Sequence, residues 1–181
     1  MADKSTFEVL HEFVAPAREK LSAGSWDYLM GAAETETTHR RNRLAIDSLG
    51  FRPRVLRDVV EVDCGTQFLG HRLRLPVVLA PIGSLQDFVE DGGAAPTKAA
   101  ARFGCLHMLS SVCAPGVEAV AKAAPGYPKI FQIYVRGEPE WVDDLVAEAL
   151  SHDYTAICFT VDLDYYGRRE RDKAKRYKPT A

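Results

Sequence analysis

The sequence predicts an α/β fold in which strands and helices alternate along the chain. Four apolar runs have the length and continuous apolarity of strands buried on both faces. They span 76–80, 105–109, 129–135 and 156–161, with centres near residues 78, 107, 132 and 159. Helical stretches at 96–103, 116–124 and 139–150 separate them. This repeat predicts parallel strands with right-handed crossovers, in either an open doubly wound sheet or part of an eight-stranded barrel.

The first fifty residues predict helices. Residues 7–21 carry apolar side chains at helical spacing, and Pro16 is expected to kink or divide this segment. Ser25 is a candidate N-cap for a second, short helix. Residues 36–49 predict a third helix, which Gly50 is expected to stop.

A small hairpin is predicted before the first buried strand, from short runs at 66–69 and 72–75 among glycines. The predicted organisation therefore has three parts. They are N-terminal helices with the hairpin (1–74), four strands with their helices (75–166), and a charged C-terminal segment (167–181).

The charge is nearly balanced overall but uneven along the chain. Among 181 residues, 23 Lys and Arg face 25 Asp and Glu, a net charge of −2 that argues against nucleic acid or an anionic membrane as partner. Residues 167–181 hold seven basic and two acidic side chains, a local charge of +5. A nucleic-acid-binding hypothesis rests on this run alone.

The four cysteines are irregularly spaced and form no metal or redox pair, so free thiols in a reducing compartment are expected. No apolar signal-peptide region follows the first Met, and the longest apolar run is too short to cross a bilayer. These observations predict a soluble cytoplasmic protein without a transmembrane segment.

Functional residues are expected where the parallel strands end, in either architecture. Small or hydrogen-bonding side chains follow each predicted strand, at 80–84, 109–111, 132–134 and 160–162. Hydroxyls, an amide and backbone N–H groups suit a neutral heterocycle rich in carbonyls and ring nitrogens better than a metal. The absence of GxGxxG and GxxxxGK sequences argues against a nicotinamide dinucleotide or a P-loop nucleotide.

Taken in order, several short motifs resemble the FMN-dependent α-hydroxy acid oxidase and dehydrogenase family, which includes glycolate oxidase and L-lactate dehydrogenase. The motifs are Trp26-Asp27-Tyr28, 52–59, 79–83, 109–111, 131–134, and 160–162 followed by Gly167-Arg168-Arg169-Glu170. The resemblance implies a (βα)8 barrel with FMN at the C-terminal mouth. This chain would then be the N-terminal half of that barrel, with about four βα units.

The resemblance also implies roles for individual residues. The backbone of Ala80, Pro81, Ile82 and Gly83 would lie against the flavin, and Ser110, Gln132 and Thr160 would hydrogen-bond its ring. Tyr28, Tyr134 and Arg169 would face the substrate, with Arg169 binding its carboxylate through a bidentate contact. Asp162 would orient its neighbours, and Tyr28, Tyr134 and Asp162 are the candidate catalytic residues of this chain. No metal is implied.

The family's catalytic base is a histidine in a His-Gly-Gly-Arg motif, and none of the five histidines here precedes Gly-Gly-Arg. Four strands do not close a barrel, so exposed strand edges and apolar surface are expected. The expected partners are therefore a C-terminal half-barrel, on a second chain or as a missing segment, and further copies of the chain. Residues 167–181 would begin a mobile active-site loop whose charge attracts hydroxy acids and FMN phosphate.

The expected function is oxidation of a small (S)-2-hydroxy acid to a 2-oxo acid, with FMN N5 accepting the hydride equivalent. The chain alone is expected to be inactive, because it lacks the base. The alternative is a truncated, non-catalytic half-barrel that binds flavin or a protein partner. Simpler interpretations make Tyr28 and Tyr134 packing residues and His107 a satisfied core histidine, whereas a buried Gln132 requires partners.

Overall fold

A computed structural model describes residues 7–163 and 165–180 and divides into two compact units. The helical unit holds the described residues up to Arg52 together with Gly167–Pro179. The barrel unit holds Pro53–Tyr166 and Thr180, apart from residue 164. The three-part organisation with a boundary at residue 75 stays a prediction from the sequence.

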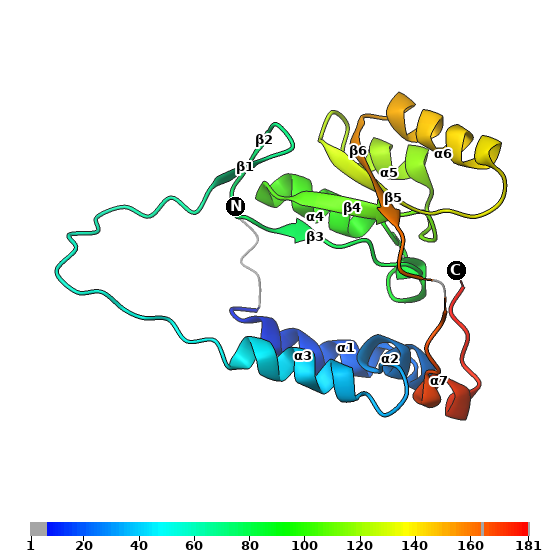
Figure 1. Ribbon diagram of the computed structural model, residues 1–181, viewed down its shortest axis with the longest axis horizontal. Coiled ribbons are helices and arrows are strands. Elements are labelled where there is room, and N and C mark those ends of the chain that lie inside the picture. Colours follow the sequence, from blue (N-terminus) through cyan, green and yellow to red (C-terminus); the bar gives the residue numbers. More distant parts are fainter. Residues whose placement is uncertain (1–6, 164, 181) are drawn as a thin grey trace. The chain divides into compact units, whose positions relative to one another are not determined.

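A parallel four-stranded sheet forms the centre of the barrel unit (Figure 1). Its strands are β3 (Val78–Leu79), β4 (Leu106–Ser110), β5 (Lys129–Tyr134) and β6 (Tyr154–Thr160), and they pair in sequence order. The helices α4 (Ala94–Phe103), α5 (Val117–Ala123) and α6 (Pro139–Ser151) alternate with the last three strands. The predicted strand–helix alternation is confirmed. An unbroken order fits part of a barrel better than a doubly wound sheet, whose strand order reverses direction.

The predicted hairpin is also confirmed. Strand β1 (Thr66–Phe68) pairs antiparallel with β2 (His71–Leu73). Leu69 and Gly70 connect them, both with positive φ, as a tight two-residue hairpin turn requires. A 3-10 turn, η2 (Leu85–Asp87), follows β3.

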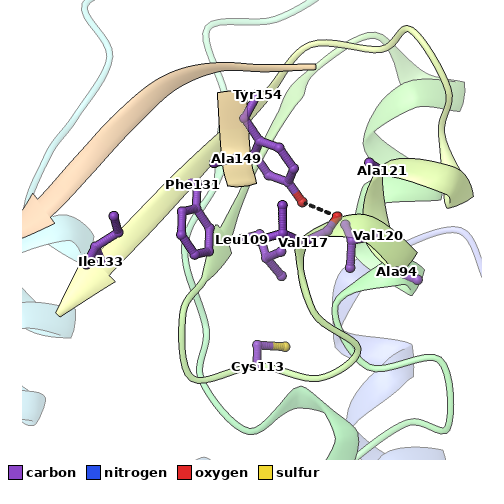
Figure 2. Close-up of a cluster of buried hydrophobic side chains, with 10 residues drawn as sticks. All are labelled: Ala94, Leu109, Cys113, Val117, Val120, Ala121, Phe131, Ile133, Ala149 and Tyr154. Atoms are coloured by element: carbon purple, nitrogen blue, oxygen red, sulfur yellow. Dashed lines mark hydrogen bonds between the residues drawn. The ribbon is translucent and has the colours of Figure 1, made fainter. Parts of the chain in front are cut away.

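The two faces of the sheet bury different clusters. Leu109, Phe131 and Ile133 point toward the helices and pack with residues of α5 and α6 (Figure 2). The Tyr154 hydroxyl donates to the Val117 carbonyl at 3.2 Å across this cluster. On the opposite face, Leu73 from the hairpin packs against Leu106 and Ile130. The alternation of faces along each strand fixes which side chains reach the barrel interior.

His107 lies on the helix-facing side of β4 and is 2% exposed. Its Nδ1 is 2.7 Å from Thr97 Oγ1, and Thr97 donates its one proton to the Gly93 carbonyl at 2.9 Å. Nδ1–H is therefore the donor to Thr97. Burial lowers the pKa of His107 to about 4. The prediction of a satisfied core histidine is confirmed.

The helical unit contains η1 (Leu10–Phe13), α1 (Val14–Lys20), α2 (Ala23–Met30), α3 (Thr37–Asp47) and α7 (Glu170–Lys175). The segment predicted around Pro16 is divided, although Pro16 lies inside α1 rather than at the break. Its position in the first turn removes no intrahelical hydrogen bond. No helix in the described part of the chain is long and apolar enough to span a membrane.

Two predicted helix ends in this unit were wrong. Ser22, rather than Ser25, caps α2, because its Oγ accepts a hydrogen bond from Ser25 N at 3.0 Å. Helix α3 ends at Asp47 with Ser48 as its C-cap, before Gly50. Serine satisfies the free backbone groups at both helix ends, which removes the need for the glycine.

The C-terminal segment was expected to begin a loop, and the structure instead contains helix α7 there. Arg171 Nε lies 2.6 Å from Glu36 Oε1, and Lys175 is paired with Asp27. Acidic side chains from the first forty residues of the chain thus partly balance the basic run. These ion pairs explain why so polar a segment is ordered as a helix.

Candidate functional site at the strand ends

The C-terminal ends of β4, β5 and β6 bring three of the predicted residues together. Ser110 is paired in register with Gln132. Gln132 Nε2 donates to Thr160 Oγ1 at 2.7 Å, which joins β5 to β6. Ser110 and Gln132 are 2% and 1% exposed, so this is a buried polar edge at the strand ends. Alternation along parallel strands places these side chains on one face.

Gln132 leaves one polar atom without a partner. Its Oε1 is buried and accepts no hydrogen bond from any described residue. Leaving a buried acceptor unsatisfied costs about 1–3 kcal/mol, so native structures supply a donor from water, ligand or protein. The Ser110 Oγ, by contrast, accepts from Val112 N at 3.3 Å. The free amide oxygen therefore marks a place where a ligand N–H group fits.

The loop after β3 holds the predicted residues 80–83 close to the loop after β4. Ser84 N donates to the Val112 carbonyl at 3.0 Å. A Cβ at Gly83 would lie 2.9 Å from Val112 Cγ2, closer than side chains tolerate. Glycine at this position thus lets the two loops approach each other closely. Ser84 Oγ is a second buried atom without a partner.

Tyr134 lines a cavity of about 390 Å³ at the ends of β5 and β6. The other lining residues are Val135, Arg136, Thr160, Val161, Leu163 and Tyr166. The Arg136 guanidinium carbon lies 5.6 Å from the centre of the Tyr134 ring. Arg136 Nη2 also donates to the Tyr166 hydroxyl at 3.5 Å. Sequence reasoning missed Arg136, because a charged residue just after a strand gives no signal that separates it from a solvated one.

Tyr28 and Arg169 come together in the helical unit. The Arg169 guanidinium carbon lies 4.7 Å from the centre of the Tyr28 ring. Its Nη2 donates to the carbonyls of Tyr28 at 2.5 Å and Gly31 at 3.2 Å. Its Nε donates to Asp172 Oδ2 at 2.5 Å. Contacts within the chain thus engage Nε and Nη2 of Arg169. The substrate role of Arg169 stays a prediction.

Asp162 follows β6 and is exposed to solvent. It does not line the cavity, and its orienting role also stays a prediction. The described residues contain no group of three His, Cys, Asp or Glu side chains that could hold a metal ion. The polar edge therefore consists of hydroxyl and amide groups. Arg136 lines the cavity that adjoins this edge at Thr160.

Comparison with known proteins identifies relatives of this chain. The family model for FMN-dependent dehydrogenases matches residues 17–181. Glycolate oxidase 1 of Zea mays is 38% identical over 166 residues, and glycolate oxidase of Spinacia oleracea is 36% identical over 168. These alignments cover 92% and 93% of this chain but 45% of each relative. The chain therefore spans about half the length of the curated relatives that it matches.

Solved structures agree with this assignment. A mandelate oxidase crystal structure with benzoyl-formic acid matches with a TM-score of 0.89 and 29% identity. A second, with (S)-2-phenylpropionate, matches with a TM-score of 0.90 and 30% identity. Each match covers 96% of this chain and 51% of the other. The structure is part of an α/β barrel, and the chain belongs to the FMN-dependent dehydrogenase family.

Proposed function

We propose that this chain forms the N-terminal half of an FMN-dependent enzyme that oxidises small (S)-2-hydroxy acids to 2-oxo acids. FMN is the cofactor of the family to which the chain belongs. The observation that carries the proposal is the buried Gln132 amide, whose Oε1 lacks a donor at the end of β5. Its place between Ser110 and Thr160 supports a flavin-ring site.

The donor set of this edge fits an isoalloxazine ring. Gln132 Oε1 would accept a hydrogen bond from a ring N–H group, and the hydroxyls of Ser110 and Thr160 would supply further hydrogen bonds to ring heteroatoms. In this proposal the backbone of Ala80, Pro81, Ile82 and Gly83 would lie against the ring, and Gly83 has no side chain to hold the ring away. When bound, FMN supplies the hydride acceptor at N5.

Substrate recognition in this proposal falls to aromatic and basic side chains. Tyr134 lines the cavity at the ends of β5 and β6. Tyr28 and Arg169 contribute from the helical unit, where Nη1 of Arg169 remains for a substrate carboxylate. Asp162 orients its neighbours. The substrate class follows the names of the relatives, which are glycolate and mandelate oxidases.

The catalytic base comes from the second half of the barrel, on the same longer chain or on a separate one. The described residues expose large apolar side chains that such a half would cover, including Val55, Leu56 and Val60 at 81%, 101% and 90%. Association of further copies and a cytoplasmic location are also part of the proposal. The competing function is a half-barrel that binds flavin or a protein partner without turnover.

The test is anaerobic reduction of bound flavin in this chain assembled with the second half of the barrel. We expect glycolate or (S)-mandelate to bleach the absorption of oxidised flavin when the second half supplies the histidine base. A variant of that half without the histidine serves as the control and should stay oxidised. Flavin that is bound but stays oxidised with every 2-hydroxy acid would support the non-catalytic alternative instead.

A further inference from the structure

Arg136 is the only basic side chain among the described residues that line the 390 Å³ cavity beside Tyr134. It lies just beyond the end of β5, and its charge has no acidic partner among the residues that the structure describes. Its recorded side-chain contacts are the Tyr134 ring and the Tyr166 hydroxyl. A guanidinium held by two tyrosines and left without a counter-ion is prepared to bind an anion.

The other arginine predicted to meet substrate is in a different electrostatic state. Arg169 has Asp172 at 2.5 Å, and Asp172 is 7% exposed, so a carboxylate of the chain already compensates its charge. Among the residues that the structure describes, Arg136 has no such partner. An incoming anionic group is therefore attracted more strongly by Arg136 than by Arg169, whose Nε and Nη2 already donate hydrogen bonds within the chain.

The position of Arg136 indicates which anionic group of a substrate it would bind. Tyr134 and Thr160 are paired in register at the strand ends, where the reacting end of a hydroxy acid would lie against the flavin edge. Arg136 follows two residues later, just beyond the end of β5. Its guanidinium carbon lies 5.6 Å from the centre of the Tyr134 ring, and Arg136 lines the same cavity as Tyr134 and Thr160. Val161 and Leu163 supply the apolar lining between polar groups.

We propose that Arg136 binds a second carboxylate, so that this protein selects 2-hydroxy dicarboxylic acids over 2-hydroxy monocarboxylic acids. The inference rests on the proposed function and narrows its substrate class. It departs from the names of the relatives, because glycolate and mandelate carry one carboxylate each. A planar guanidinium recognises a carboxylate directionally, and one charge-assisted contact is enough for about tenfold in affinity.

The experiment is isothermal titration of the full chain with (S)-malate and (S)-lactate, because all of the lining residues belong to the barrel unit. We expect (S)-malate to bind about tenfold more tightly than (S)-lactate. Arg136→Gln should bring the two affinities together by weakening (S)-malate alone, and Arg136→Lys should keep part of the preference. Arg102→Gln, which removes an exposed arginine on α4, is the matched control and should keep the full preference.

Three results would overturn the inference. The first is equal affinity of the unaltered chain for both acids, and the second is an unchanged preference in Arg136→Gln. The third is an equal loss of affinity for both acids in that variant, because Arg136 would then bind the carboxylate that both acids share. The flavin content of the assembled barrel distinguishes failure of this inference from failure of the proposed function. Arg136-dependent malate binding without flavin retention would contradict the proposed function only, whereas flavin retention without malate preference would contradict the inference only.

Discussion

The two compact units are stabilised by different forces. In the barrel unit, strands β4 and β5 bury apolar side chains such as Leu109, Phe131 and Ile133 to 2% exposure or less. In the described part of the helical unit, Ser25 and Asp172 are the buried residues, and both are polar. Ion pairs such as Arg171–Glu36 connect its elements. The barrel unit therefore has a packed core to fix the strand ends, whereas the helical unit depends on charge and capping.

Core truncation in the barrel unit should have the largest effect. Phe131→Ala removes a side chain that packs edge-to-face on Tyr154, with ring centres 5.8 Å apart. We expect a loss of about 3–5 kcal/mol in free energy of unfolding, measured by urea denaturation. Phe159→Ala on β6, where the side chain is 47% exposed, is the matched control and should lose much less. Equal losses would contradict the assignment of Phe131 to the packed core.

The pH dependence of stability should also come from the barrel unit. His107 has a pKa of about 4 when folded, against 6.5 for an unburied histidine, so the unfolded chain takes up a proton first as the pH falls. Stability should therefore be complete above pH 6.5 and fall by about 3 kcal/mol as pH drops toward 4. Urea midpoints across this range measure the loss.

A variant pair isolates this contribution. His107→Gln should be less stable at neutral pH but should lose this part of the slope, because the titrating group is gone. His39→Gln removes an exposed histidine of α3 and should keep the whole slope. An unchanged slope in His107→Gln would assign the pH dependence to other groups.

The helical unit should respond to removal of a carboxylate. Asp172→Asn weakens the partner of Arg169 Nε, and we expect about 1–2 kcal/mol of local destabilisation. Hydrogen exchange should accelerate in α2 and α7 while amides of β5 keep their protection. Asp47→Asn, which removes the exposed partner of Arg43, is the control. Faster exchange spread evenly over both units would show that they do not unfold separately.

The smallest effect concerns a single helix cap. Ser22→Ala removes the oxygen that accepts from Ser25 N and should cost about 1 kcal/mol. Ser22→Asp should restore most of that loss, because aspartate caps equally well. Exchange rates of the first amides of α2 provide the measurement. Equal exchange rates in all three proteins would show that the Ser22 side chain does not stabilise the start of α2.

Much of the barrel unit could be predicted because its elements follow local patterns. Continuous apolar runs located β4, β5 and β6, and a glutamine inside such a run pointed to Gln132. Helix α7 gave no comparable signal, because it has six residues and its partners lie more than 130 positions earlier in the chain. Arg136 was missed for a related reason. A charged residue after a strand is ordinarily solvated, and only the fold places it on Tyr134.

The central claim is that the buried polar edge of β4, β5 and β6 holds the flavin ring. Its most direct test is the affinity for FMN of the chain assembled with the second half of the barrel, measured by quenching of flavin fluorescence. We expect Gln132→Leu to weaken FMN binding at least tenfold, while Gln67→Leu, at an exposed position of β1, leaves it unchanged. Equal FMN affinity in the Gln132→Leu protein and the unaltered protein would contradict the account.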